Sequence, residues 1–105
     1  MPVIIPSLAA VEIASAIARA ADDTEGALAY VSAVLGLPYL SVIQLTGPLS
    51  RQAATLAATQ RLRGADAIYV AVARRYGTTL VSRDRELRAR GAAVVDCRTP
   101  EAAFR

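Results

Sequence analysis

Two aspartates in the second half of the chain stand where the backbone is expected to change from one kind of structure to another. Asp66 falls in the first turn of a helix predicted over residues 65–76, where free backbone N–H groups and the helix dipole favour an anion. Asp84 follows residues 78–81, whose composition is typical of an inner strand of a parallel sheet. Ligands of open α/β sheets bind beyond the carboxyl ends of the strands, so the two aspartates together predict a site. The alternative is that Asp66 only favours a helix start and that Asp84 only caps a helix over residues 84–90.

A third carboxylate, Glu12, lies on an otherwise apolar helix predicted over residues 7–21. None of its neighbours three or four residues away is charged, so no cation within the helix can pair with it. A carboxylate in such a setting either faces solvent or is held for a purpose, and both interpretations stay open.

Carboxylates are the candidate catalytic groups of this chain because His and Cys, the other common ones, are absent or nearly so. The chain has no His and one Cys, so Ser-His-Asp and Cys-His mechanisms are excluded, and neither a zinc site nor an internal disulfide is expected. There is no glycine-rich phosphate-binding loop. Chemistry that relies on carboxylates points to a hard cation held by oxygen ligands.

Length and charge limit the class of protein. The 105 residues suit one domain, and a hydrophobic content of 54% is enough for a core. Residues 1–50 carry a net charge of −3 and residues 51–105 a net charge of +6, all of the basic residues being Arg. A basic second half suits a polyanionic partner, since guanidinium groups bind phosphate well. The alternative is an Arg-rich surface that is merely solvated.

No segment of the sequence suggests a membrane or an exported protein. The N-terminus lacks a basic segment followed by a long apolar run, so no signal peptide is expected. No apolar stretch reaches the roughly 18 residues that a membrane helix needs. We therefore expect a cytoplasmic protein without membrane contact.

Helical and extended stretches alternate along the chain, which predicts an α/β fold, a three-layer α/β/α sandwich with a mostly parallel sheet. Ser7 is expected to cap the first helix, and Gly77 to end the fourth as a C′ residue. The predicted strands are 3–5, 39–45, 78–81 and 92–96, and the predicted helices are 7–21, 25–35, 50–62, 65–76, 84–90 and 100–104.

The run GADAIYVAVARRYGTTLVSRDREL resembles the C-terminal half of the PIN-domain nucleases of the VapC toxin kind. In that family an Asp opens a buried helix in a D-A-x-x-x-A-x-A setting, which Asp66 and the alanines after it match. A strand then ends in a T/S-x-D step, matched here by Ser82-Arg83-Asp84. Upstream, IIPSLAAVEIASAIAR resembles the P-x-L-x-x-x-E helix of the family and places its glutamate at Glu12. The resemblance extends over the chain from Val3 onward.

This resemblance implies a single PIN-like domain over residues 1–105 that acts as an Mg²⁺- or Mn²⁺-dependent endoribonuclease, often the toxin of a toxin–antitoxin pair. It assigns catalytic and metal-binding roles to Glu12, Asp66 and Asp84. Arg83 and Arg85 are expected to hold the RNA backbone, and Ser82 to orient Asp84 or a water molecule. RNA and an antitoxin protein are the partners implied.

The chain also departs from the family pattern. Family members begin with a central strand followed by an Asp in a D-x-S/T step, and the stretch VIIPS has that outline without an acid. We therefore expect the family's first strand, first helical region and first Asp to be absent from residues 1–105. Weak or absent cleavage follows, because metal organisation suffers. A homodimer or higher oligomer also follows, because an open apolar strand edge recruits another chain.

Two other functions remain open at this stage. The first is a non-catalytic PIN-like module that binds a protein partner or RNA, which the missing Asp favours and the other three acids oppose. The second is a small α/β oligomer with no role in nucleic-acid binding.

Overall fold

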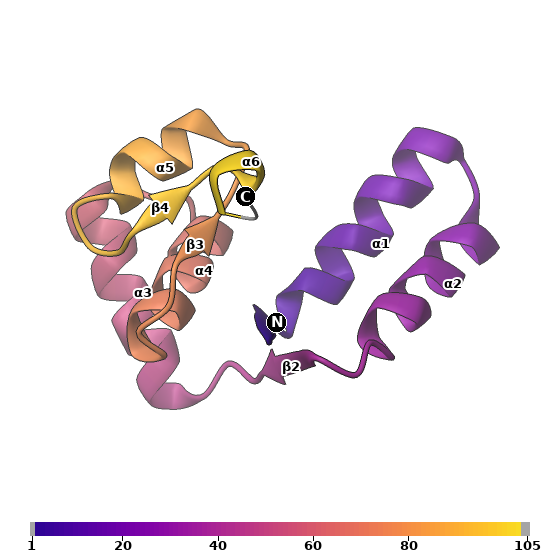
Figure 1. Cartoon of the computed structure of the whole chain (residues 1–105), viewed down its shortest axis with the longest axis horizontal. Helices are drawn as coiled ribbons and strands as arrows, with labels where there is room; N and C mark the ends of the chain where they lie inside the picture. Colours follow the sequence, from indigo (N-terminus) through magenta and orange to yellow (C-terminus); the bar gives the residue numbers. More distant parts are fainter. Residues whose placement is uncertain (1, 104–105) are drawn as a thin grey trace. The chain divides into compact units, whose positions relative to one another are not determined.

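A computed structural model describes residues 2–103 and contains helices and parallel strands, as the sequence predicts (Figure 1). The strands are β1 (Val3–Pro6), β2 (Leu40–Ile43), β3 (Leu80–Val81) and β4 (Cys97–Arg98). The helices are α1 (Leu8–Ala21), α2 (Thr24–Leu35), α3 (Gly47–Gln60), α4 (Gly64–Arg75), α5 (Arg85–Gly91) and α6 (Pro100–Ala103). Phe104, the last residue of the predicted final helix, lies outside the described residues. No helix in the described part of the chain is long and apolar enough to cross a membrane.

The chain folds as two compact units, an N-terminal unit (Met1–Gln44) and a C-terminal unit (Leu45–Arg105). Among the described residues the strands form two two-stranded sheets, β1 with β2 and β3 with β4, so each unit has its own sheet. Both pairings are parallel, which confirms the predicted α/β class and strand direction. Whether residues 1–105 make one PIN-like domain, as predicted, stays a prediction.

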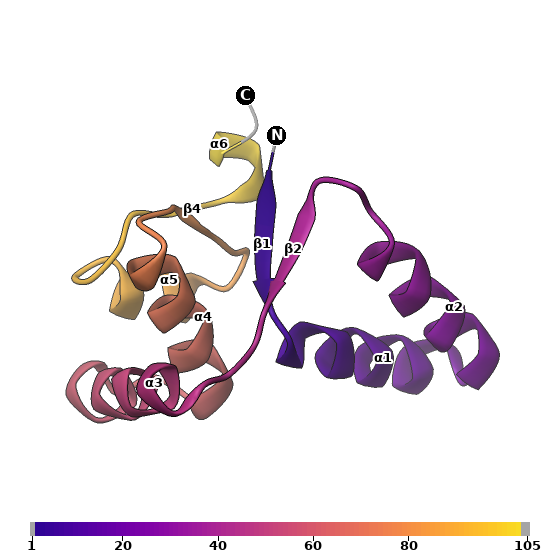
Figure 2. The same cartoon turned by 90° about the horizontal axis from the view of Figure 1, so that it is seen from below.

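In the N-terminal unit, β1 and β2 lie side by side with Val3 opposite Leu40 and Pro6 opposite Ile43 (Figure 2). Parallel neighbours need a crossover connection, and α1 followed by α2 supplies it. The two helices pack against each other, and alanine is the buried residue on each.

α2 begins at Thr24, one residue earlier than predicted, and α1 begins directly after Ser7, but the prediction that Ser7 caps it is wrong. Asp23 caps α2, because its Oδ1 accepts a hydrogen bond from the Gly26 N–H at 2.9 Å. Ser7 has helical dihedral angles, φ −58° and ψ −27°, and its hydroxyl makes no capping bond. A capping side chain needs an extended backbone at that position. The Ser7 N–H instead donates to the Ile43 carbonyl at 2.9 Å, which continues the pairing of β1 with β2.

The C-terminal unit is built on α3 packed against α4. α3 begins at Gly47, three residues earlier than predicted, because Thr46 caps it by accepting from the Leu49 N–H at 3.3 Å. Pro48 fits the first turn of this helix, where its missing N–H costs nothing. The side chains that α3 buries are Leu49, Ala53 and Leu56, and those that α4 buries are Ala67, Val70, Ala71, Val72 and Ala73.

A tight turn at Gly77 reverses the chain after α4. Gly77 has a φ of 59°, its N–H donates to the Arg74 carbonyl at 3.2 Å, and the Thr78 N–H donates to the Ala73 carbonyl at 3.0 Å. These two bonds are those of a Schellman motif, so the prediction that Gly77 is the C′ residue is confirmed. β3 therefore runs back along α4, which it contacts.

The predicted last strand, 92–96, is misplaced. The N–H groups of Val94 and Val95 both donate to the Gly91 carbonyl, at 2.9 and 3.0 Å, so the chain continues to turn after α5. The strand begins only at Cys97, where Leu80 pairs with Cys97 and Val81 with Arg98.

Candidate nuclease site

Four elements of the C-terminal unit meet at Gly91. A Cβ atom at Gly91 would lie 3.1 Å from Cys97 Sγ, 3.4 Å from Val70 Cγ2 and 3.9 Å from Leu80 Cδ2. The missing side chain therefore permits α4, β3, α5 and β4 to approach closely at this point. Val70 and Leu80 are both buried, so they mark one level of the core.

Asp66 and the Ser82–Asp84 step reach the same end of this unit. Asp66 precedes Val70 by one helical turn on the same face, about 6 Å along α4. Ser82 follows Leu80 by two residues, about 7 Å along an extended chain. Because β3 runs opposite to α4, both steps lead in the same direction. The two aspartates therefore lie beyond the carboxyl end of β3, where the sequence predicts a site.

Asp84 is the N-cap of α5. Its Oδ1 accepts a hydrogen bond from the Leu87 N–H at 3.1 Å, and its own N–H donates to Ser82 Oγ at 3.0 Å. The side chain is exposed. A carboxylate has two oxygens with about four lone-pair positions, so one capping bond leaves capacity for a cation. Capping and ligand binding are therefore compatible at this residue.

Asp66 is half-buried in the first turn of α4, as predicted. The helix begins just before it, with Arg63 as an extended N-cap residue whose side chain makes no capping bond. The unsatisfied backbone N–H groups of that turn favour an anionic side chain. This end of the unit therefore offers two carboxylates and a helix N-terminus.

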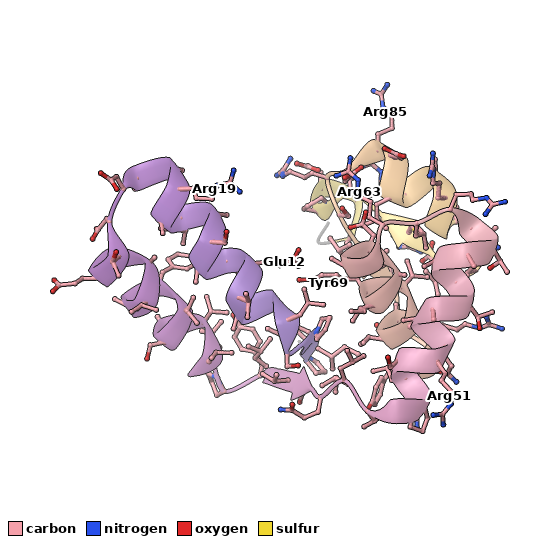
Figure 3. All side chains as sticks on the ribbon, turned by 180° about the vertical axis from the view of Figure 1, so that it is seen from behind. Glu12, Arg19, Arg51, Arg63, Tyr69 and Arg85 are labelled. Carbon is pink, nitrogen blue, oxygen red and sulfur yellow. The ribbon has the colours of Figure 1, made fainter. Side chains whose placement is uncertain are left out.

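Glu12 lies on α1 and is exposed. It belongs to the N-terminal unit, where Figure 3 labels it on α1, whereas Asp66 and Asp84 belong to the C-terminal unit. Within residues 2–103, no group of three or more Cys, Asp or Glu side chains is arranged to hold a metal ion. The site of three carboxylates stays a prediction.

The donor chemistry of Asp66 and Asp84 fits a hard divalent cation. Mg²⁺ usually keeps several waters and is commonly bound through one or two carboxylates. Both aspartates carry carboxylate oxygens, which are the ligands that such an ion prefers, and the capping bond holds Asp84 in a defined place. These two residues would hold the ion.

Ser82 and Arg83 both make contacts that bear on their predicted roles. The Ser82 hydroxyl accepts from the Asp84 N–H, so it contacts the backbone of Asp84, and its role in orienting the carboxylate stays a prediction. Arg83 Nη1 lies 2.6 Å from Glu101 Oε1 on α6, with both side chains largely exposed. Binding of a phosphate by Arg83 must therefore compete with Glu101.

Arg85 and Arg63 are exposed at the end of the unit that carries the two aspartates. Arg85 opens α5 and projects away from it, as Figure 3 shows. Arg63 was missed by the sequence reasoning, although its place three residues before Asp66 was a usable signal. Both are suited to contact a phosphate backbone.

Other arginines serve the fold. Arg74 and Arg75 lie in the last turn of α4, where cations complement the helix dipole. Arg90 pairs with Glu86 at 2.9 Å and also donates to the Arg61 carbonyl. The positive charge of the second half is therefore only partly available to a polyanion.

Arg88 was also missed, and it is the residue that joins α5 to the end of β3. Its Nη1 donates to the Ser82 carbonyl at 2.8 Å, in a partly buried position. An Arg four residues after an N-cap Asp lies on the same face of the helix, and that spacing was the available signal.

A family model, PIN domain, matches residues 2–92 of the chain. A comparison with the curated proteins finds no match. The matched range contains Glu12, Asp66, Ser82 and Asp84, in the order that the sequence resemblance gave them. PIN domains are of the nuclease type and generally depend on divalent metal ions. Because the match spans most of the sequence, the chain belongs to the PIN-domain family.

Proposed function

We propose that this protein is a divalent-metal-dependent endoribonuclease in which Asp66 and Asp84, together with Glu12, hold Mg²⁺ or Mn²⁺. The observation that carries the proposal is that Asp66 and Asp84 reach the same end of the C-terminal unit in a chain of nuclease-type family. When bound, the ion supplies Lewis acidity at a phosphodiester oxygen.

The side chains around the two aspartates have separate tasks in this proposal. Asp84 is held by the Leu87 N–H and directs its other oxygen to the ion. The Ser82 hydroxyl keeps the backbone of Asp84 in place. Arg63, Arg83 and Arg85 bind backbone phosphates of single-stranded RNA, so affinity falls steeply as salt rises. We expect weak turnover, because these few carboxylates suffice for one hydrated ion and two-metal chemistry needs more ligands.

Cleavage of a single-stranded RNA tests the proposal. The substrate is incubated with the protein and Mn²⁺, Mg²⁺ or EDTA, and the products are separated on a gel. Slow cleavage should require the metal and fall to background in Asp66→Asn and Asp84→Asn. Asp23→Asn is the matched control, since Asn is also a good N-cap and Asp23 lies in the N-terminal unit. Cleavage that survives EDTA or either site variant would contradict the proposal.

The alternative is a non-catalytic PIN-like module that binds RNA or a protein partner. It is favoured by the lack of a three-acid group suited to a metal among residues 2–103. Under this alternative RNA still binds and remains salt-sensitive, but no cleavage product appears with Mn²⁺, Mg²⁺ or EDTA. Filter binding alongside the cleavage assay therefore separates the two functions.

We further propose that the protein works in the cytoplasm as the toxin of a toxin–antitoxin pair and as a homodimer or higher oligomer. Large apolar side chains on the N-terminal unit support a protein partner, with Val11 70%, Leu28 59% and Tyr30 56% exposed. Light scattering after size exclusion should give the mass of two or more chains, and Leu28→Asp should lower it. Ser32→Asp, at another exposed position of α2, is the control. A wild-type monomer at micromolar concentration would exclude the oligomer.

A further inference from the structure

Arg88 differs from the other arginines of the C-terminal unit that border the candidate site. Its guanidinium group is turned toward the protein and donates to the Ser82 carbonyl at 2.8 Å. Arg83 contacts an exposed carboxylate and Arg85 projects from the start of α5. Burial and Asp96 raise the pKa of the Cys97 thiol, and Arg88 partly opposes that rise, so the guanidinium also lies near β4.

Ser82 is fixed through both of its backbone groups. Its N–H donates to the Arg98 carbonyl at 3.0 Å, one step beyond the last pair of β3 and β4. Its carbonyl accepts from Arg88, and no strand pairing is needed to satisfy it. A backbone held at both N–H and C=O has little freedom left, so the Ser82 hydroxyl is presented in one place.

A short chain of hydrogen bonds then leads from Ser82 to the Asp84 carboxylate. The Asp84 N–H donates to Ser82 Oγ at 3.0 Å, and the Leu87 N–H donates to Asp84 Oδ1 at 3.1 Å. The Arg88 N–H donates to the Asp84 carbonyl at 3.1 Å, so Arg88 contacts Ser82 through its side chain and Asp84 through its backbone. Groups joined in this way respond as a unit when one member is removed.

We infer that Arg88 is a positioning residue for Asp84: its guanidinium group anchors the Ser82 carbonyl, and through Ser82 it fixes the direction in which the Asp84 carboxylate meets a divalent cation. The inference rests on the proposed function for the metal. Partners that orient a metal ligand commonly change metal affinity about 10- to 100-fold when they are removed.

The first test needs no metal. Amide hydrogen exchange is measured by NMR on metal-free wild type and on Arg88→Met, which keeps an unbranched apolar stem in place of the donor. The amides of Asp84 and Leu87 should exchange faster in Arg88→Met, while the buried amides of α3 keep their rates. Arg51→Met is the matched control, because Arg51 lies near the start of α3, away from α5.

The second test uses Mn²⁺ alone as the probe, with its dissociation constant measured by calorimetry. Arg88→Met should weaken binding about 10- to 100-fold. Arg88→Lys should recover most of the loss, since an ammonium group can still donate to a carbonyl. Ser82→Ala removes the next hydrogen bond in the same series. The double variant Arg88→Met/Ser82→Ala should therefore lose no more Mn²⁺ affinity than the weaker-binding of the two single variants.

Each outcome decides the inference. Unchanged Mn²⁺ affinity in Arg88→Met, or additive losses in the double variant, would overturn it and leave Arg88 with a purely structural role. If Arg88→Met does not fold, Arg88→Lys and Ser82→Ala carry the same comparison. A wild-type chain that binds no Mn²⁺ would overturn the proposed function, and unaltered exchange at Asp84 would independently overturn the positioning role.

Discussion

The guanidinium group of Arg83 and the carboxylate of Glu101 form an ion pair, with Nη1 2.6 Å from Oε1. The pair ties α6 to the segment between β3 and α5 that leads to Asp84. The Glu101 backbone and then Arg83 hold the pKa of this carboxyl below its ordinary value. Glu101 therefore occupies, within the chain itself, the position that a phosphate oxygen would take on Arg83.

Replacing Glu101 should strengthen RNA binding. In Glu101→Gln the guanidinium group of Arg83 is released, so affinity for single-stranded RNA should rise a few-fold at low salt. Fluorescence anisotropy with a labelled oligonucleotide measures the change. Glu86→Gln is the control, because Glu86 pairs with Arg90 and not with Arg83. Equal gains in both variants would mean that net charge alone is responsible.

The same pair has a defined pH dependence. A carboxyl group whose pKa is lowered by folding stabilises the fold above its unfolded pKa, about 4.3 for Glu, and loses that contribution as pH falls through the folded value. The difference in melting temperature between wild type and Glu101→Gln should therefore be constant between pH 6 and 8. It should disappear as the pH falls below about 4.3 and through the lowered pKa of Glu101. A difference that appears only above pH 7 would show that another group is titrating.

A divalent cation should stabilise the protein through Asp66 and Asp84. An ion at about ten times its dissociation constant contributes about 1.4 kcal/mol, enough to raise the melting temperature by several degrees. Asp66→Asn should abolish the increment, because it removes the charge of one of the two oxygen ligands. Thermal melts with Mn²⁺, Mg²⁺ and EDTA measure this. An equal shift in wild type and Asp66→Asn would rule the site out.

Two substitutions at Asp84 separate its two tasks. Asp84→Ala removes the cap of α5 and should lower the free energy of unfolding by about 0.5–2 kcal/mol. Asp84→Asn keeps a capping side chain, so stability should be nearly unchanged, but the ligand charge and the metal-dependent shift should both be lost. Denaturant unfolding and metal titration of the two variants give the answer. Metal binding that persists in Asp84→Asn would leave capping as the only role of this residue.

A larger residue at Gly91 should be destabilising because it would crowd the side chain of Cys97. The Cβ of Gly91→Ala would lie 3.1 Å from Cys97 Sγ, so the variant should be destabilised by about 1–3 kcal/mol through overpacking. The double variant Gly91→Ala/Cys97→Ala should recover part of the lost stability, because it lacks Cys97 Sγ, the atom nearest to the new Cβ. Gly64→Ala is the control, since nothing lies within 4 Å of a Cβ there. Equal stability of Gly91→Ala and wild type would show that the contact relaxes without cost.

Local signals in the sequence were sufficient for the region around the two aspartates. Gly77 predicted the end of α4, the residues after it predicted β3, and Asp84 predicted the cap of α5, while its role as a site residue stays a prediction. These features depend on capping and turn preferences within a few residues. That is why they could be read without knowledge of the rest of the fold.

Features that depend on distant partners were predicted less well. The four-residue spacing of Ile68, Val72 and Tyr76 predicts one buried face for α4, but Tyr76 is the C-cap residue and 51% exposed. Residues 92–96 have a β-branched composition, yet the turn that follows Gly91 delays β4 to Cys97. The spacing of Arg88 from Asp84 indicated a shared helix face but not the contact with Ser82, because a bond from a side chain to a backbone carbonyl leaves no periodic pattern.

Because of the Schellman turn at Gly77, the position of Asp84 relative to Asp66 depends on the number of residues between Gly77 and Leu80. Because that turn fixes where the returning strand begins, each residue added between Gly77 and Leu80 would slide the Ser82–Asp84 step by about 3.3 Å and turn Leu80 away from the core. Side chains along this return can vary widely without moving Asp84. The number of residues in this segment cannot change without moving Asp84. Insertions and deletions between Gly77 and Leu80 should therefore be far less tolerated than substitutions.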